Sequence, residues 1–287
     1  MMISLTCLLM YRQLYNAYRK RYRVLIKREL DKQTKQILNG EQPSKEGLKN
    51  TLRNLQQGAS KAMAKHSYTK IRKSAGIKDS MTPEQKWADI MRILIEKSLE
   101  KLVDDITETT KEKVRQALIK GVQENWDLRK IIQEIEKAGV NAYRAELIAR
   151  TETTKAANQG SLLGAVSTGL QSVKEWIAIL DDRTRRTPRD MFDHFTMDGK
   201  QVPIDELFTV TGSESTASME YPGDPSGGLG NICNCRCTIG FEALRDANDK
   251  PIPIQGGLRG AAGEMWNLWN NPVFLQVNRG VYEALPG

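Results

Sequence analysis

The spacing of apolar residues changes once along this 287-residue chain, close to Gly169. Before that point most apolar side chains recur at steps of three and four residues, which is the period of an amphipathic helix. Beyond it, Val173–Leu180 alternates loosely and is rich in β-branched and aromatic residues, as a strand is. The sequence therefore predicts an α+β protein with a helical, basic N-terminal half, a compact C-terminal domain with short antiparallel strands, and an extended C-terminal tail.

Local start and stop signals place the helices. Residues 82–85, Thr-Pro-Glu-Gln, combine a hydroxyl cap, proline at the first helical position and a capping-box glutamine, and they predict a long helix that reaches about Gly121. Asp127 is expected to cap a short helix, and Asn141 opens another. Residues 40–76 show weak periodicity and contain internal glycines, so we expect a shorter helix there, followed by a mobile basic connection.

Smaller signals complete the outline. Gly160 and Gly164 on the helix after Asn141 would let another backbone come close. Asp198-Gly199 indicates a turn, residues 237–241 a closing strand, and residues 265–269 a short helix within the tail. We expect four parts: a basic helical arm (1–80), long helices (81–137), the compact domain (138–241) and the extended tail (242–287).

The basic charge is concentrated in the first part. Residues 1–80 hold 18 Lys or Arg and 5 Asp or Glu, whereas the rest of the chain is slightly acidic. Such asymmetry is typical of an arm that meets nucleic acid, a membrane surface or an acidic protein, although a solvated helical face is an equally plain interpretation. The side chains that we predict to bind DNA or a partner are Arg12, Arg19, Lys20, Arg21, Arg23, Lys27 and Arg28. Tyrosines interleaved with them could stack on bases, but at helical spacing we favour packing against a partner helix.

Neither a membrane span nor a disulfide framework is indicated. No apolar run approaches the roughly 20 residues that a spanning helix needs. Residues 1–10 are apolar, but the positive charges follow them instead of preceding them, so we interpret this stretch as a helix start and not as an export signal. Cys7 stands alone while the other three cysteines cluster, which fits synthesis in a reducing cytoplasm. We therefore expect no membrane partner.

The cysteine cluster is the sharpest local feature. Cys233, Cys235 and Cys237 lie downstream of His194, and three thiols with one imidazole are sufficient ligands for tetrahedral zinc. In a regular strand, however, successive residues on one face lie some 6–7 Å apart, so the three thiols could not share one ion unless the strand kinks. A pair of these cysteines with His194 is easier, with a carboxylate such as Asp182 or water completing the shell. Small thiols packed in a tight core remain the alternative.

The sequence contains few groups of residues that could catalyse a reaction. Asp181 and Asp182 beside His194 could hold a divalent ion, so a metal-dependent nuclease or toxin-like effector is the alternative function. Three nearby arginines could instead neutralise these acids in an ion-pair network. The chain has only two histidines and shows no triad order, nucleotide-binding glycine loop or zinc-protease helix. A regulatory DNA-binding protein is disfavoured because no short recognition-helix unit is present.

Polar residues follow one another in a specific order from about residue 138 to residue 241. In that order they resemble the Mu F-like phage head morphogenesis domain, and the ordered series is more specific than any single motif. The motifs are Ile148-Ala149-Arg150-Thr151-Glu152, Asn158-Gln159-Gly160, Trp176, Asp182-Arg183-Thr184-Arg185, His194, Asp198-Gly199, Tyr221-Pro222-Gly223-Asp224-Pro225 and Asn234-Cys235-Arg236-Cys237-Thr238.

The resemblance implies a minor head protein of a tailed bacteriophage. It implies association with the portal protein at the portal vertex, with other phage head proteins and with packaged double-stranded DNA, during head assembly or genome ejection. It places the protein in the virion head, and in the host cytoplasm during assembly. The basic first part suits DNA contact because phosphate neutralisation is largely independent of sequence.

We expect the polar signature to serve architecture and not turnover. Polar residues so close together on a buried helix are expected to bond to loop backbone or to each other. Some relatives carry toxin domains after this region, but about 46 residues remain here, fewer than an autonomous catalytic domain usually requires. We therefore predict no enzyme and no certain cofactor, with structural zinc as a candidate. The signature residues are Arg150, Thr151, Glu152, Asn158, Trp176, Asp182, Arg183, Arg185, His194, Cys235 and Cys237.

Overall fold

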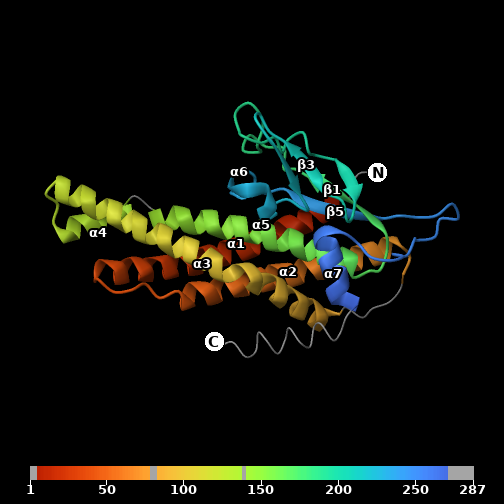
Figure 1. The fold of residues 1–287 in the computed structure, drawn as a ribbon, viewed down its shortest axis with the longest axis horizontal. Helices are drawn as coiled ribbons and strands as arrows, with labels where there is room; N and C mark the ends of the chain where they lie inside the picture. The colour runs from red at the N-terminus through yellow and green to blue at the C-terminus, as the bar shows by residue number, and fades with distance from the viewer. Residues whose placement is uncertain (1–4, 78–82, 138–139, 271–287) are drawn as a thin grey trace.

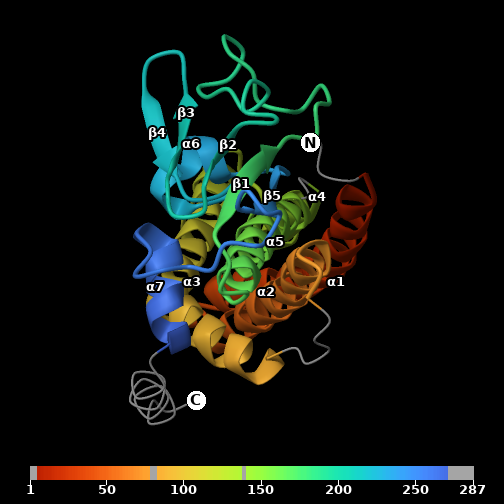
Figure 2. The ribbon, with the colours of Figure 1, turned by 90° about the vertical axis from the view of Figure 1, so that its right-hand side faces the viewer.

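The computed structural model describes residues 5–77, 83–137 and 140–270. Long helices lie side by side in an elongated body, and the strands form a smaller layer on one side of it (Figure 1, Figure 2). The helices of the body are α1 (Leu5–Leu38), α2 (Glu46–Ser74), α3 (Glu84–Gln123), α4 (Leu128–Lys137) and α5 (Val140–Val166). The predicted cap of α4 is confirmed, since the Asp127 carboxylate accepts a hydrogen bond from the Lys130 amide at 2.7 Å. Thr82, the expected cap of α3, lies outside the described residues.

The tyrosine stripe of α1 packs inward. Tyr11, Tyr15 and Tyr22 are buried, and Ile26 and Leu30 below them are fully buried against α2 and α5. The rings of Tyr11 and Tyr15 stack with centroids 5.9 Å apart. The interpretation that these tyrosines pack against partner helices is confirmed.

The expectation for residues 40–76 was wrong: α2 is one continuous helix of 29 residues. Its periodicity is weak because α2 packs against α1, α3 and α5, so apolar side chains are needed on more than one face. Gly58 does not mark a flexible connection. A Cβ atom there would lie 2.8 Å from the ring of Tyr18, so the glycine makes room for that ring.

The backbones of α2 and α5 are in close contact where the two helices pack together. A Cβ atom at Gly160 would lie 2.1 Å from the carbonyl oxygen of Ser60, and one at Gly164 would lie 2.2 Å from that of Ala64. Any side chain at either position would therefore force the helices apart. The predicted close approach of another backbone is confirmed, and α2 supplies that backbone.

Short antiparallel strands follow α5. A three-stranded sheet has the order β2-β1-β5, in which Trp176 of β1 is opposite Ile239 of β5. The predicted turn at Asp198-Gly199 is confirmed, with Gly199 at φ +75° just before β2. The predicted α+β class is confirmed as well. The elements are β1 (Ser172–Ile177), β2 (Gln201–Pro203), β3 (Phe208–Thr211), β4 (Thr216–Met219), the 3-10 helix η1 (Pro225–Gly227), α6 (Gly228–Ile232) and β5 (Thr238–Ala243).

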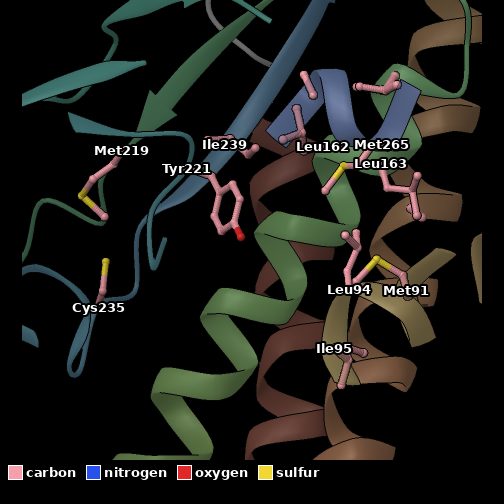
Figure 3. Close-up of a cluster of buried hydrophobic side chains, with 14 of the residues drawn as sticks. Met91, Leu94, Ile95, Leu162, Leu163, Met219, Tyr221, Cys235, Ile239 and Met265 are labelled. Carbon is pink, nitrogen blue, oxygen red and sulfur yellow. The ribbon is translucent and has the colours of Figure 1, made fainter. Parts of the chain in front are cut away.

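In its described part, the tail has an extended segment followed by α7 (Gly260–Asn270), which includes the short helix predicted there. The extended segment runs beside the end of α5, where the Ile254 amide donates to the Gly169 carbonyl at 2.8 Å. Met265 of α7 is buried beside Leu162 and Leu163 of α5 (Figure 3). One buried cluster thus connects α1, α5, the strands and α7. The division of the chain at residues 80, 137 and 241 stays a prediction.

Within the described ranges, every helix is too short or too polar to form a membrane-spanning segment.

A buried ion pair joins the sheet to the segment before η1. Lys174 of β1 is fully buried, and its Nζ lies 3.0 Å from Oε2 of Glu220. Burial lowers the pKa of Lys174, whereas Glu220 acts to raise it. The second carboxylate oxygen of Glu220 accepts from the Ala261 amide at 2.7 Å, at the start of α7. Glu220 therefore holds the sheet and the tail helix together.

We predict that Glu220→Gln lowers the free energy of unfolding by about 3–5 kcal/mol, because it leaves a buried lysine without its counter-charge. The amide oxygen can still accept from Ala261, so the substitution isolates the charge. Urea denaturation followed by circular dichroism measures the loss. Glu242→Gln, at an exposed position on β5, is the control and should change stability by less than about 0.5 kcal/mol. Equal losses in the two variants would contradict the prediction.

Candidate functional site

Side chains of α5 hold the loop that precedes β5. Asn158 is fully buried, and its amide nitrogen donates to the carbonyl oxygens of Pro222 at 2.7 Å and Cys237 at 3.1 Å. Its amide oxygen accepts from the Thr238 hydroxyl at 2.9 Å and from the Ile239 amide at 3.2 Å. All the hydrogen-bonding capacity of this side chain is used for two loops.

Residues one and two turns before Asn158 on α5 also bind the loop that precedes β5. The Thr154 hydroxyl donates to the Cys235 carbonyl at 2.7 Å, and the Thr151 hydroxyl accepts from the Asn234 amide at 3.2 Å. Arg150 donates to the Asn234 side chain at 2.8 Å. The expectation that polar residues of this helix bond to loop backbone is confirmed for these positions.

The loop places two cysteines beside the predicted histidine. His194 is 1% exposed, and its Nδ1 lies 3.6 Å from Sγ of Cys235 and 3.8 Å from Sγ of Cys237. The ligand atoms of these three residues all lie within 4.8 Å of one another. Asn234, between Cys233 and Cys235, takes a positive φ of 61°, so the chain does not run as a regular strand through all three cysteines. This bend separates Cys233 from the two cysteines that lie beside His194.

The electrostatics of the two thiols differ. The hydrogen bond from Cys237 holds the pKa of Cys235 well below its usual range, and His194 adds to this effect against the opposing effect of burial. The same contact and burial raise the pKa of Cys237. Cys235 is therefore the thiol that is predisposed to carry negative charge.

Hydrogen bonds fix the histidine ring. The Asn231 amide nitrogen donates to the Gly227 carbonyl at 2.9 Å, so its oxygen is turned toward His194 Nε2, also at 2.9 Å. Nε2 must then carry the proton, which leaves the lone pair of Nδ1 directed at the thiols. The Trp176 ring closes the other side, edge to face with His194 at 5.2 Å between centroids.

Other predicted site residues lie around this centre. Arg185 donates to the carbonyl oxygen of Cys233, whose thiol is only partly buried and is not part of the cluster. Glu152 points elsewhere, accepting from Gln56 of α2 at 2.6 Å. Asp182 is exposed, and its side chain has no hydrogen bond or ion pair in the described part of the chain. Asp182 was therefore wrongly expected as a member of this neighbourhood.

The carboxylates of the alternative catalytic site are not among the clustered ligands. Asp181 pairs with Arg236, which holds the pKa of that carboxyl well below its usual range. In the described residues, the group of side chains able to hold a metal contains His194 and two cysteines but neither Asp181 nor Asp182. The predicted arrangement for metal-dependent hydrolysis is therefore not assembled.

A basic pocket lies between the start of α1, α5 and the loops. Its volume is about 280 Å³, and five arginines line it together with Tyr11, Tyr15, Asn16 and Ile179; the arginines are Arg12, Arg19, Arg150, Arg183 and Arg236. Glu146 pairs with Arg19 and Arg150, and Asp181 pairs with Arg236. Arg12 and Arg183 are exposed, and their guanidinium groups have no ion-pair partner among the described residues. The pocket therefore carries excess positive charge.

Two buried tyrosines line this pocket. The hydroxyls of Tyr11 and Tyr15 are buried, and neither has a hydrogen-bond partner of regular geometry in the described chain. Burial raises the pKa of Tyr15 to about 12, so its hydroxyl keeps its proton. Because both hydroxyls are buried, the donors that an anion in the pocket would meet are the guanidinium groups.

The remaining basic residues of α1 lie on its exposed face. Lys20, Arg21, Arg23, Lys27 and Arg28 are all exposed. Arg23, Lys27 and Arg28 are within ion-pair distance of acids, namely Glu146, Asp31 and Glu29. The predicted DNA or partner surface thus consists of this face and, through Arg12 and Arg19, of one wall of the arginine pocket.

Several contributing residues were not found from the sequence. Asn231 lies two residues before Cys233, but no pattern identified it as the partner of His194. Glu146, which binds Arg19 across 127 residues of sequence, could not be recognised because its role depends on how α1 packs against α5. Arg236 is part of a quoted motif, but no role was predicted for it. Its position between Cys235 and Cys237 predicts that its side chain points to the side opposite the two thiols.

Residues 112–240 match the family model described as Phage Mu protein F like protein. Residues 112–240, somewhat less than half of the chain, are therefore similar to the Mu F-like family. The match begins within α3 and ends in β5, so it covers the arginines of α5, the histidine and both buried cysteines. The predicted resemblance is confirmed, and the Mu F-like segment begins earlier than the expected residue 138.

A curated relative gives a second comparison. The chain is 31% identical over 147 residues to a protein named NAD(+)--arginine ADP-ribosyltransferase EFV from Enterococcus faecalis (strain ATCC 700802 / V583). The aligned part is 50% of this chain and 27% of the relative, so this chain spans about a quarter of that protein's length. No solved structure gives a significant match.

We predict that Asn158→Ala strongly destabilises the Mu F-like segment. The substitution leaves the Pro222 and Cys237 carbonyls and the Ile239 amide without this partner, and each unsatisfied buried group costs about 1–3 kcal/mol. Thermal denaturation should show a clear loss of Tm. Asn248→Ala, in an exposed turn where the side chain makes no hydrogen bond with the described residues, should leave Tm nearly unchanged. A Tm for Asn158→Ala like that of the wild type would show that the amide is not needed.

Proposed function

We propose that this chain is a structural minor head protein of a tailed bacteriophage, which associates with the portal protein and other head proteins and contacts packaged DNA. The observation that carries the proposal is the Mu F-like segment, in which the signature residues Thr151 and Asn158 are buried and occupied by contacts with loops. Side chains used in this way stabilise an architecture, since a catalytic group needs access to substrate. The place of action is the virion head, after assembly in the host cytoplasm.

The DNA part of the proposal is supported by the arginine pocket. Duplex DNA presents closely spaced phosphates, and Arg side chains bind phosphate through paired hydrogen bonds. Two arginines of the pocket, Arg12 and Arg183, have no counter-charge among the residues that the structure describes, and the exposed basic face of α1 continues from Arg12 toward Arg28. A phosphate in the pocket would fix the position of the duplex, and the α1 face would contact neighbouring phosphates without regard to sequence.

We predict that Arg12→Ala/Arg183→Ala weakens binding to duplex DNA of any sequence. Each lost phosphate contact should reduce the slope of log affinity against log salt by about 1, so the double variant should reduce it by about 2. Fluorescence anisotropy with labelled duplexes between low and physiological salt measures both effects.

The control removes two positive charges elsewhere. Lys113→Ala/Arg129→Ala changes exposed residues of α3 and α4 that do not line the pocket. This control variant should keep most of the wild-type slope of log affinity against log salt. If both double variants lose the same affinity, the pocket has no special role. If the wild-type chain shows no salt-sensitive binding, the DNA part of the proposal is wrong.

The ADP-ribosyltransferase relative is the observation that favours a second, enzymatic function. Its name concerns a protein of which this chain matches about a quarter, and we propose that the likeness extends to a head-protein segment and not to NAD chemistry. Incubation of the purified chain with labelled NAD+ and arginine-containing protein tests this directly, and we expect no transfer of label. A nuclease assay with added divalent metal tests the other enzymatic alternative. Turnover in either assay that His194→Ala abolishes would overturn the structural proposal.

A further inference from the structure

We propose that His194, Cys235 and Cys237 bind a zinc ion that is buried at the centre of the Mu F-like segment. The three residues come from two loops, one before β2 and one before β5. An ion held by all three would therefore link those loops, and through Thr154 and Asn158 it would link both to α5.

The separations of the three ligand atoms fit tetrahedral zinc. With a Zn–S bond of about 2.3 Å, a Zn–N bond of about 2.0–2.1 Å and a tetrahedral angle, sulfur and nitrogen should lie about 3.5 Å apart. The observed separations of His194 Nδ1 from the two sulfurs are 3.6 Å and 3.8 Å. Only small adjustments would be needed to place an ion between the three atoms.

The histidine is prepared as a ligand. A metal-binding imidazole needs a free lone pair on one nitrogen and usually donates its other N–H to an oxygen acceptor. The Asn231 oxygen accepts from Nε2, and Asn231 is itself held by the Gly227 carbonyl, so Nδ1 keeps its lone pair toward the cysteines.

Charge balance also favours a divalent ion at this depth. His194, Cys235 and Cys237 are each at most 3% exposed, and Trp176 beside them is fully buried. Two thiolates, one neutral imidazole and Zn²⁺ carry no net charge, so the complete site avoids the cost of an unpaired buried ion. Binding would release the two thiol protons to solvent while zinc keeps its oxidation state.

The protein supplies three of the four ligands that such an ion takes. Structural zinc usually has four ligands, and the residues described here offer three within reach, since Cys233 lies outside the cluster and its carbonyl is bound by Arg185. We assign the fourth position to water. Thiolates select zinc over magnesium or calcium, which prefer oxygen ligands.

The test is metal analysis of the full chain, purified without a metal-affinity matrix. We expect about one zinc per chain by elemental mass spectrometry, and loss of nearly all of it in Cys235→Ser and Cys237→Ser. Cys233→Ser is the matched control, because it removes a neighbouring thiol outside the cluster, and it should keep its zinc.

Cobalt substitution keeps the proposal falsifiable if the serine variants do not fold. Wild-type chain refolded with Co²⁺ should show the thiolate-to-cobalt absorption band and the strong visible bands of tetrahedral cobalt, and Cys233→Ser should show both unchanged. A folded wild-type chain with neither zinc nor these bands would overturn the proposal. So would a disulfide between Cys235 and Cys237 in protein kept under reducing conditions, or loss of zinc in Cys233→Ser equal to that in the other two variants.

Discussion

The buried amide of Asn158 is the interaction on which the arrangement of the Mu F-like segment depends. It lies on α5, the helix that packs against both α1 and α2, and it binds loop backbone on two sides. Because loops carry unpaired backbone groups, they can be buried against a helix only where a side chain satisfies those groups. One asparagine therefore determines where the loops lie, and with them the position of the buried cysteines.

Local signals were a good guide to several elements and a poor guide to α2. The helices from Glu84 and from Val140 were predictable because start signals precede them, and the strand around Trp176 because its residues alternate. In α2, which packs against α1, α3 and α5, the apolar residues follow no single stripe. Gly58 pointed to a flexible connection only because the tyrosine that it accommodates lies on another helix.

The site was predictable as a set of residues and not as an arrangement. The chemistry of the side chains was enough to predict that His194 and cysteines form one group. Which two of the three cysteines contact His194 depends on the bend at Asn234, which the sequence did not reveal. Asp182 was predicted to lie in the site, but its neighbour Asp181 is the carboxylate that pairs with Arg236. The sequence does not show which of two adjacent carboxylates turns toward an arginine. The pairing of Glu146 with Arg19 depends on helix packing, which no local pattern specifies.

The two halves of the candidate site share one short loop. Cys235 and Cys237 point toward His194. Arg236, between them, binds Asp181, and Asn234, just before them, binds Arg150, both at the arginine pocket. Alternate residues of an extended chain point to opposite sides, so whatever orders the thiols also orders the pocket wall. A metal bound by the two thiols would thus also fix the position of Arg236 in the arginine pocket, although the metal makes no contact with the pocket. The sulfur cluster then has a structural consequence at the surface where DNA is proposed to bind.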